Sequence, residues 1–249
     1  MGLASGSFAN VCIVRLPAGG SLWTPRSRCP ACGSGIRAVD NIPLLSFMAL
    51  KGHCRSCAAH ISVQYPLVEG AMALLFLLNA VYFRSDLMRL VGADILAFYF
   101  LTLSIIDYQH RIIPDELSLS LLILGLCLSF FNPYLGHTGL HGFFKSLISA
   151  LGTGLAMLLM AWLGEKIFKK EALGGGDVKL EAAVGATLGW EGAFGSLFLG
   201  SLIGAMVAIA LMISGKKKRG DTLPFGPFLS FGAYAICFLP QTWFRFLFA

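Results

Sequence analysis

Charged residues are scarce in this sequence: Asp, Glu, Lys and Arg together make up 13% of its 249 residues. Soluble domains carry about 25% of such residues, so the composition argues against a soluble globular protein. The sequence also lacks an HExxH motif, a GxxxxGK[ST] loop and a GxGxxG stretch after a predicted strand. These absences argue against a zinc metalloprotease, a P-loop nucleotide site and a Rossmann fold.

Hydrophobic residues instead account for 56% of the chain, and the mean hydropathy is +0.75. A short apolar run from Val178 to Trp190 can cross a membrane only where it is buried in protein or wet. Counted with seven longer apolar runs, this run gives eight segments. We therefore expect an all-α polytopic membrane protein with about eight transmembrane segments. The seven other apolar runs lie near residues 1–14, 66–83, 92–108, 117–131, 144–165, 193–213 and 224–246.

The basic residues indicate which loops face the cytoplasm. Eight crossings place loops 15–65, 107–116, 166–179 and 214–222 on one side, and these loops contain 15 of the 19 Lys and Arg residues. Lys and Arg concentrate in cytoplasmic loops, so we expect this side to be cytoplasmic. Membrane topology then explains the formal charge of +6 without nucleic-acid binding.

Three domains are expected from this pattern. Residues 1–14 form a short first membrane segment, because they lack the basic start and cleavage site of a signal peptide. Residues 15–65 form a polar cytoplasmic loop domain, and residues 66–249 form the membrane domain. The loop is too small for a large core, so we expect a metal or disulfides to stabilise it.

The polar loop contains two CxxC pairs, formed by Cys29, Cys32, Cys54 and Cys57. Such pairs are typical of a tetrahedral Zn²⁺ site, and four thiolate ligands leave no open position, so we expect a structural zinc. Two disulfides are the alternative, but cytoplasmic thiols stay reduced. A redox CxxC is less consistent with the sequence, since no thioredoxin-like pattern follows. His53 and His60 lie nearby and are the other available ligands.

Two aspartates lie at the ends of apolar runs. Asp107 ends one run shortly before Pro114, and Asp177 follows three glycines and precedes the run that begins at Val178. Carboxylates at membrane depth cost roughly 2.5–3.5 kcal/mol to insert and are therefore candidates for function. Simpler interpretations stay open: Asp107 as an interfacial charge at a helix end, and Asp177 as a helix N-cap.

Together the two aspartates indicate a specific chemistry. In the eight-segment topology both lie at cytoplasmic ends of membrane segments, at similar depth. Two carboxyl groups held close share a proton, because adjacent negative charges repel. One can then act as a base on water, and the other as an acid toward the carbonyl or the leaving amine. We therefore expect Asp107 and Asp177 to form the catalytic pair of an aspartic endopeptidase.

Several motifs along nearly the whole chain resemble the type IV prepilin peptidase family, the prepilin leader peptidases and N-methyltransferases. The resemblance places the first catalytic role on Asp107 rather than Asp115, and the second on Asp177 of a GxGD motif. The motifs, in chain order, are GSFANVCIVRLP, RSRCPACG, NIPLLS, CRSC, YPLVEG, IDYQHRIIPDEL, LGGGDVKL and LPFGPFLSFGAY.

The resemblance implies more than the residues show by themselves. It implies a multi-pass protein of the bacterial cytoplasmic (inner) membrane, whose substrates are type IV prepilins or type II secretion pseudopilins. Cleavage would follow a leader glycine at the cytoplasmic face. Family members with the cysteine-bearing loop usually also methylate the new N-terminal residue with S-adenosylmethionine, and Gly52 matches a position linked with methyl transfer.

Two other classes fit part of the pattern. Buried carboxylates and glycine-broken helices also mark secondary transporters, although the sequence has no internal repeat and its key carboxylates lie at segment ends. A zinc-bearing membrane scaffold without activity is the third interpretation, and such a protein would tolerate loss of both aspartates.

Overall fold

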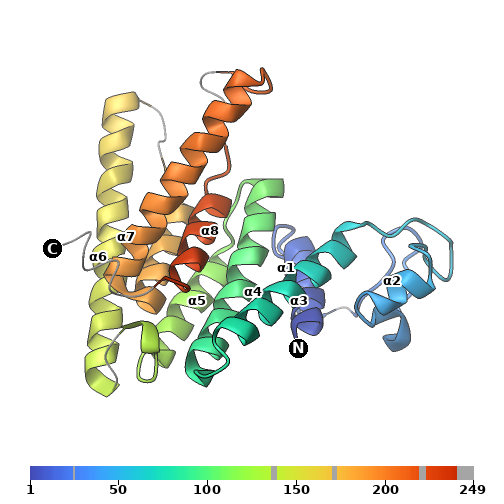
Figure 1. Ribbon diagram of the computed structural model, residues 1–249. Helices are drawn as coiled ribbons and strands as arrows, with labels where there is room; N and C mark the ends of the chain where they lie inside the picture. The colour runs from blue at the N-terminus through green and yellow to red at the C-terminus, as the bar shows by residue number, and fades with distance from the viewer. Residues whose placement is uncertain (25, 136–138, 170–172, 219–222, 240–249) are drawn as a thin grey trace. The chain divides into compact units, whose positions relative to one another are not determined.

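The computed structural model describes residues 1–24, 26–135, 139–169, 173–218 and 223–239. Within these ranges the chain is helical, and its β-structure is limited to two isolated bridges. The chain divides into two compact units, Met1–Ser85 and Asp86–Ala249 (Figure 1). The first unit contains α1 (Gly2–Arg15), η1 (Ala38–Asn41), α2 (Leu45–Ala49) and α3 (Gln64–Tyr82). The second contains α4 (Leu87–His110), α5 (Asp115–Leu128), η2 (Pro133–Leu135), α6 (Gly139–Phe168), α7 (Gly175–Ile213) and α8 (Gly226–Ile236).

In the first unit, α1 packs directly against α3. A side chain at Gly6 would place its Cβ 2.6 Å from the Cα of Glu69, so the absence of a side chain allows the two backbones to approach. Farther along α1, the Asn10 side chain donates a hydrogen bond of 3.0 Å to the carbonyl of Tyr65 at the start of α3. The loop that was expected to be a separate domain therefore connects two helices that pack together.

The polar loop between α1 and α3 is ordered by a few directed contacts. The backbone N–H of Leu44 donates to the Glu69 carboxylate at 2.8 Å, which ties the start of α2 to α3. Arg55 donates from both Nε and Nη2 to Asp40 in η1. This paired guanidinium holds the pKa of the Asp40 carboxyl below its usual value. The loop thus lacks long helices but has a defined path.

In the second unit, α7 is two helical arms rather than one straight rod. Gly189 interrupts the helix with φ 77° and ψ 173°, a conformation that is open almost only to glycine. The Glu181 and Ser196 side chains, on either side of Gly189, lie 2.7 Å apart. Residues 15 positions apart in a straight helix would be separated by about 22 Å, so the chain folds back at Gly189.

The other helices of this unit pack around the two arms of α7. The first arm contacts α5 and α6, and the second arm contacts α8, which also packs against α4 (Figure 1). Small residues make these approaches close: a Cβ at Gly200 would lie 2.9 Å from the Phe228 carbonyl oxygen. The Ser146 hydroxyl of α6 donates to the Ala186 carbonyl at 2.6 Å.

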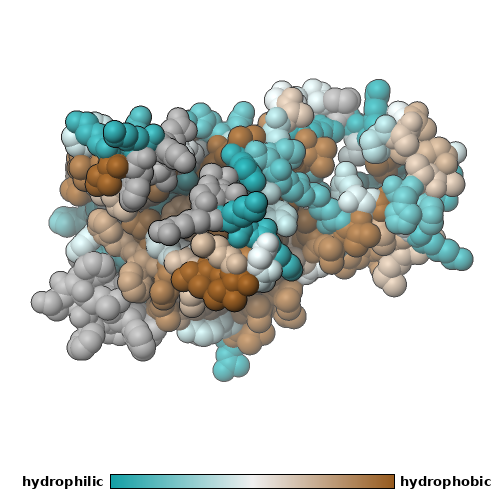
Figure 2. Space-filling model, turned by 90° about the horizontal axis from the view of Figure 1, so that it is seen from above, coloured by the Kyte–Doolittle hydropathy of each residue, from teal (hydrophilic) through white to brown (hydrophobic). Residues whose placement is uncertain are grey.

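The surface of the molecule is apolar over long stretches. Large hydrophobic side chains such as Leu155, Trp162 and Phe198 are exposed, and Figure 2 shows broad hydrophobic areas on one face. By length and composition α3, α4, α6 and α7 can each cross a membrane. Such a surface suits lipid, so the chain is a multi-pass membrane protein, as the sequence predicts.

The helices differ from the eight expected segments in informative ways. Only four helices among the described residues are long and apolar enough to count as spans. The number is smaller than eight because α1, α5 and α8 are short and because two expected segments are the arms of α7. The expected run 224–246 is described only as far as residue 239, and Arg219 and Arg245 lie outside the described residues.

Candidate active site and metal centre

Asp107 lies in the last turn of α4, with only 6% of its surface exposed. A negative charge is unfavourable at a helix C-terminus, so capping does not explain an aspartate at this position. The backbone N–H of Gly226, the first residue of α8, donates to Asp107 Oδ2 at 2.9 Å. A Cβ at Gly226 would lie 2.8 Å from that oxygen, so only glycine leaves room for the carboxyl group.

Asp177 lies in the first turn of α7. Gly174, and not Asp177, is the N-cap residue of this helix, and the Asp177 carboxyl group interacts with the Gly174 backbone from the third helical position. Gly176 is in close contact with the loop before α5, where an added Cβ would lie 2.8 Å from Ile113 Cβ. The glycines before Asp177 therefore bring the start of α7 against the start of α5.

The structure brings the two aspartates into one neighbourhood. Asp107 and Asp177 are close enough for their carboxyl groups to repel each other electrostatically. Lys179 and Asp115 form an ion pair of 2.6 Å between α7 and α5, with both side chains about half exposed. Asp115 is therefore paired at the surface, whereas Asp107 is buried beside Asp177. The end of α4 and the starts of α5, α7 and α8 together frame the site.

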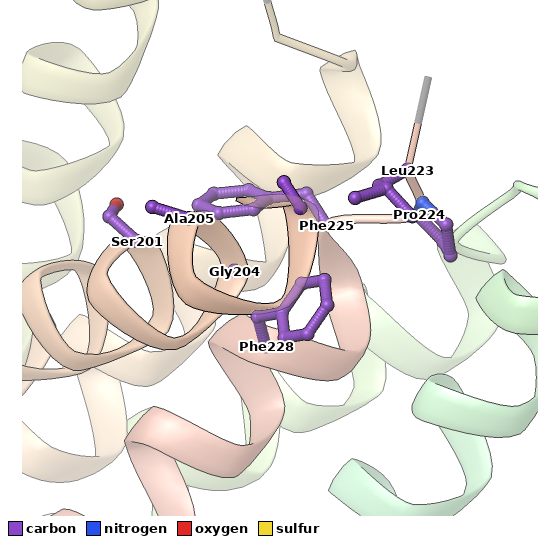
Figure 3. Close-up of a pocket in the computed structure, with 8 residues that line it drawn as sticks. Ser201, Gly204, Ala205, Leu223, Pro224, Phe225 and Phe228 are labelled. Carbon is purple, nitrogen blue, oxygen red and sulfur yellow. The ribbon is translucent and has the colours of Figure 1, made fainter. Parts of the chain in front are cut away.

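An apolar cavity of about 280 Å³ lies beside the start of α8 (Figure 3). Small residues of the second α7 arm, including Gly204 and Ala205, line one side, and Phe225 and Phe228 line another. Phe225 immediately precedes Gly226, the residue that donates to Asp107. Among the described lining residues, Ser201 alone has a polar side chain, so this part of the cavity offers mainly apolar contacts.

The four cysteines of the polar loop form one cluster, as the sequence predicts. The sulfur atoms of Cys29, Cys32, Cys54 and Cys57 all lie within 4.8 Å of one another, and all four are free thiols rather than disulfides. The Cys29 and Cys57 sulfurs are 3.9 Å apart. A tetrahedral ion with Zn–S bonds of about 2.3 Å places its sulfurs about 3.8 Å apart, so the residues fit a metal ion.

Backbone and side-chain hydrogen bonds prepare the cluster for a metal. The Ser34 hydroxyl lies 2.9 Å from Cys32 Sγ, and this contact, together with hydrogen bonds from the Ser34 backbone and the neighbouring cysteines, lowers the pKa of Cys32 to about 6. Hydrogen bonds from the backbone N–H groups of Cys57 and Ser56 also lower the pKa of Cys54. Thiolate is the form that binds a metal, so the lowered pKa values of Cys32 and Cys54 favour binding, whereas hydrogen bonds with the other cysteines raise the pKa of the Cys57 thiol.

Three neighbouring residues have structural roles in this loop. His53 and His60 pair in an antiparallel bridge with their rings 5.0 Å apart, and neither belongs to the four-ligand cluster. Gly52 adopts φ 72°, its N–H donates to the Phe47 carbonyl, and its own carbonyl accepts from Ile61. Both backbone groups of Gly52 are therefore already occupied, and its role in methyl transfer stays a prediction.

One contact in the site is absent from the sequence-based prediction, whereas a further buried carboxyl group is recognisable in the sequence. The contact between Gly226 and Asp107 joins residues 119 positions apart, and the PFGP stretch gives no local sign of it. Glu181, one turn after Asp177, is 1% exposed and belongs to the same environment. Its place in an apolar run was a visible signal, since carboxylates there are costly.

Comparison with known proteins adds independent information. The model for the bacterial peptidase A24 N-terminal domain matches residues 1–83, and that for the type IV leader peptidase family matches residues 95–209. Curated proteins named prepilin leader peptidase/N-methyltransferase are similar over most of the chain. The protein of Pectobacterium carotovorum is 39% identical over 93% of this chain and 88% of its own length. That of Stutzerimonas stutzeri is 37% identical over 94% and 86%.

A third relative is considerably longer than this chain. The Myxococcus xanthus protein of the same name is 39% identical over 86% of this chain, but the chain spans only 62% of that protein's length. No solved structure matches the chain significantly.

Proposed function

Because the chain belongs to the type IV leader peptidase family, we propose that it is a prepilin peptidase that uses Asp107 and Asp177 as its catalytic pair. Its substrates are type IV prepilins or type II secretion pseudopilins, cut after a leader glycine. The observation that carries the proposal is that these two carboxyl groups, 70 positions apart in the sequence, lie near enough at converging helix ends to interact electrostatically.

The geometry supports a metal-independent hydrolysis. Mutual repulsion keeps one proton on the carboxyl pair, so one group is a carboxylate and the other an acid. The carboxylate takes a proton from water while the water oxygen attacks the peptide carbonyl, and the acid donates its proton to the carbonyl oxygen. Collapse of this gem-diol breaks the C–N bond: the aspartate that took the proton from water gives it to the leaving amine, and a hydroxyl of the gem-diol returns a proton to the other aspartate. The two aspartates then share one proton again.

The orientation in the membrane follows from the same arrangement. We place eight helical segments across the bacterial inner membrane, with the connections before α3, α5, α7 and α8 facing the cytoplasm. These connections contain most of the Lys and Arg residues, which favour that side. The site then lies at the cytoplasmic ends of its helices. The eight segments are α1, α3, α4, α5, α6, the two arms of α7 and α8.

Two further groups complete the proposal. Cys29, Cys32, Cys54 and Cys57 hold a structural Zn²⁺, which would join the two halves of the polar loop. N-methylation of the new N-terminal residue with S-adenosylmethionine is the second activity that the names of the relatives support. Gly52 serves that activity by shaping the loop next to Cys54.

Incubation of the purified full-length protein in detergent with a synthetic prepilin, followed by mass spectrometry, tests the proposal. Loss of the leader mass shows cleavage, and a further gain of one methyl group shows methylation. Asp107→Asn and Asp177→Asn are each expected to abolish cleavage, because an amide cannot share the proton. Ordinary cleavage by either variant would exclude the pair, whereas failure of the wild-type protein to cleave would favour the scaffold interpretation.

The metal site has its own test. Cys29→Ser is expected to lower zinc content and to reduce methylation more than peptide cleavage, since the cysteines lie outside the aspartate site. Cys127→Ser is the matched control, because Cys127 lies in α5 outside the cluster. Unchanged zinc content in Cys29→Ser would exclude a four-thiolate site.

A further inference from the structure

Glu181 is a buried carboxyl group for which the proposed reaction has no use. It lies in the first arm of α7, four residues after Asp177, and is 1% exposed. Its Oε1 atom lies 2.7 Å from the Ser196 hydroxyl on the second arm. An ionised carboxylate at such a position is costly unless a cation accompanies it. Among the described residues, the hydrogen-bond partner of the Glu181 carboxyl group is the Ser196 hydroxyl.

The hydrogen bonds around Ser196 indicate where the proton resides. The Ser196 hydroxyl oxygen also lies 2.9 Å from the carbonyl oxygen of Ala193. A hydroxyl group has a single proton, and a carbonyl oxygen can only accept. If Ser196 donates to Ala193, the proton between Ser196 and Glu181 must come from Glu181. A protonated Glu181 therefore satisfies every member of this chain of hydrogen bonds.

Other groups around Glu181 also favour its protonated, uncharged form. Asp177 is one turn away on its own helix, and a second negative charge there would be unfavourable. From α6, the neighbour at this level is the Thr153 hydroxyl, which lies 3.3 Å from the Glu181 carbonyl oxygen. Toward the site end, Asp107 of α4 is a further acidic group, and the Lys179 cation pairs with Asp115 of α5 at the surface.

We infer that Glu181 is an uncharged carboxylic acid that fixes the two arms of α7 to each other and thereby positions Asp177. The first arm holds Asp177, whereas the second arm packs against α8, whose first residue donates to Asp107. The Glu181–Ser196 contact is thus a link between the two halves of the catalytic pair. Glu181 is a positioning residue, and this role rests on the proposed peptidase function.

Three variants of the full-length protein test this role in the prepilin cleavage assay. Glu181→Gln keeps the shape and a neutral hydrogen-bonding group, so kcat and the pH profile should stay within about twofold of wild type. Glu181→Leu and Ser196→Ala remove the link, and each should lower kcat about tenfold or more at an unchanged KM. The double variant should lose little more than either single variant, because both remove one interaction.

Each outcome has a definite meaning. Wild-type kcat in both Ser196→Ala and Glu181→Leu would overturn the positioning role. A shifted pH limb in Glu181→Gln would overturn the uncharged state. If Glu181→Leu fails to insert or fold, Ser196→Ala decides the question, since it removes only one hydroxyl. Failure of the wild-type protein to cleave would instead reject the proposed function itself.

Discussion

Adding one methyl group at Gly176 should nearly stop catalysis, whereas adding it at Gly175 should not. The new Cβ at residue 176 would lie 2.8 Å from Ile113 Cβ, and the same atom at residue 175 meets nothing within 4 Å. Ordinary carbon–carbon contacts are about 3.5–4.0 Å, so the starts of α5 and α7 must separate by about 0.7–1.2 Å. Asp177 moves with α7.

The magnitude follows from that displacement. Overpacking of this kind costs about 1–3 kcal/mol of stability. A misplacement of about 1 Å in a reacting group can lower the rate about 100-fold. We therefore expect Gly176→Ala to fold but to show kcat reduced about 100-fold, with KM much less affected. Gly175→Ala should stay within about twofold of wild type, since both positions have helical backbone that alanine can adopt.

The assay is cleavage of a synthetic prepilin by full-length protein in detergent, with thermal unfolding of each variant measured in parallel. Wild-type kcat in Gly176→Ala would refute the steric reasoning. Equal losses in both glycine variants would show that flexibility of the triplet matters, and not the contact with Ile113. Restored activity in the double variant Gly176→Ala, Ile113→Gly would support the contact directly, because Ile113 Cβ is the nearest obstructing atom.

Three further predictions concern single residues. Gly226→Ala should lower kcat about 10- to 100-fold at pH values where wild type is active. A Cβ 2.8 Å from Asp107 Oδ2 would displace the carboxyl group and break its charge-assisted hydrogen bond, which contributes roughly 1.5–3 kcal/mol. An unaltered kcat would contradict this prediction. Gly189→Ala should lower the free energy of unfolding by about 1–3 kcal/mol in denaturant titrations, because φ 77° with ψ 173° excludes a Cβ. An unchanged midpoint of the unfolding transition would argue against the reversal of α7 at Gly189. In metal-free protein the pKa of the Cys32 thiol is lowered to about 6, so its alkylation rate should be half-maximal near about pH 6 and level off about one to two pH units higher. Ser34→Ala should move this profile to higher pH, and a profile unaffected by the substitution would exclude the hydroxyl as the cause.

Sequence patterns predicted the residues that bear chemistry better than the helices that support them. The CxxC pairs and the two aspartates are recognisable because metal ligation and buried charge restrict residue type at short spacing. The structure confirms the cysteine cluster and brings Asp107 near Asp177. Their catalytic role stays a prediction, since only a cleavage experiment tests it.

The path of α7 shows what the sequence could not provide. Hydrophobicity separated runs 178–190 and 193–213 as two crossings, which requires the chain to turn back between them, but it did not identify the residue at which the chain turns. That reversal depends on the backbone conformation at Gly189 and on the contact between Glu181 and Ser196. Both are consequences of tertiary packing, and glycine alone in an apolar run is compatible with a continuous helix.

Close packing, rather than ion pairing, sets the geometry of the aspartate site. The ion pair beside it, between Lys179 and Asp115, is about half exposed, and exposed pairs contribute only about 0–1 kcal/mol. By contrast, Gly176 against Ile113 and Gly226 against Asp107 leave no room for a methyl group. Salt should therefore change the spacing of the two carboxyl groups much less than an added methyl group does. A loss of kcat in high salt as large as that of Gly176→Ala would show that charges hold the helix ends together instead.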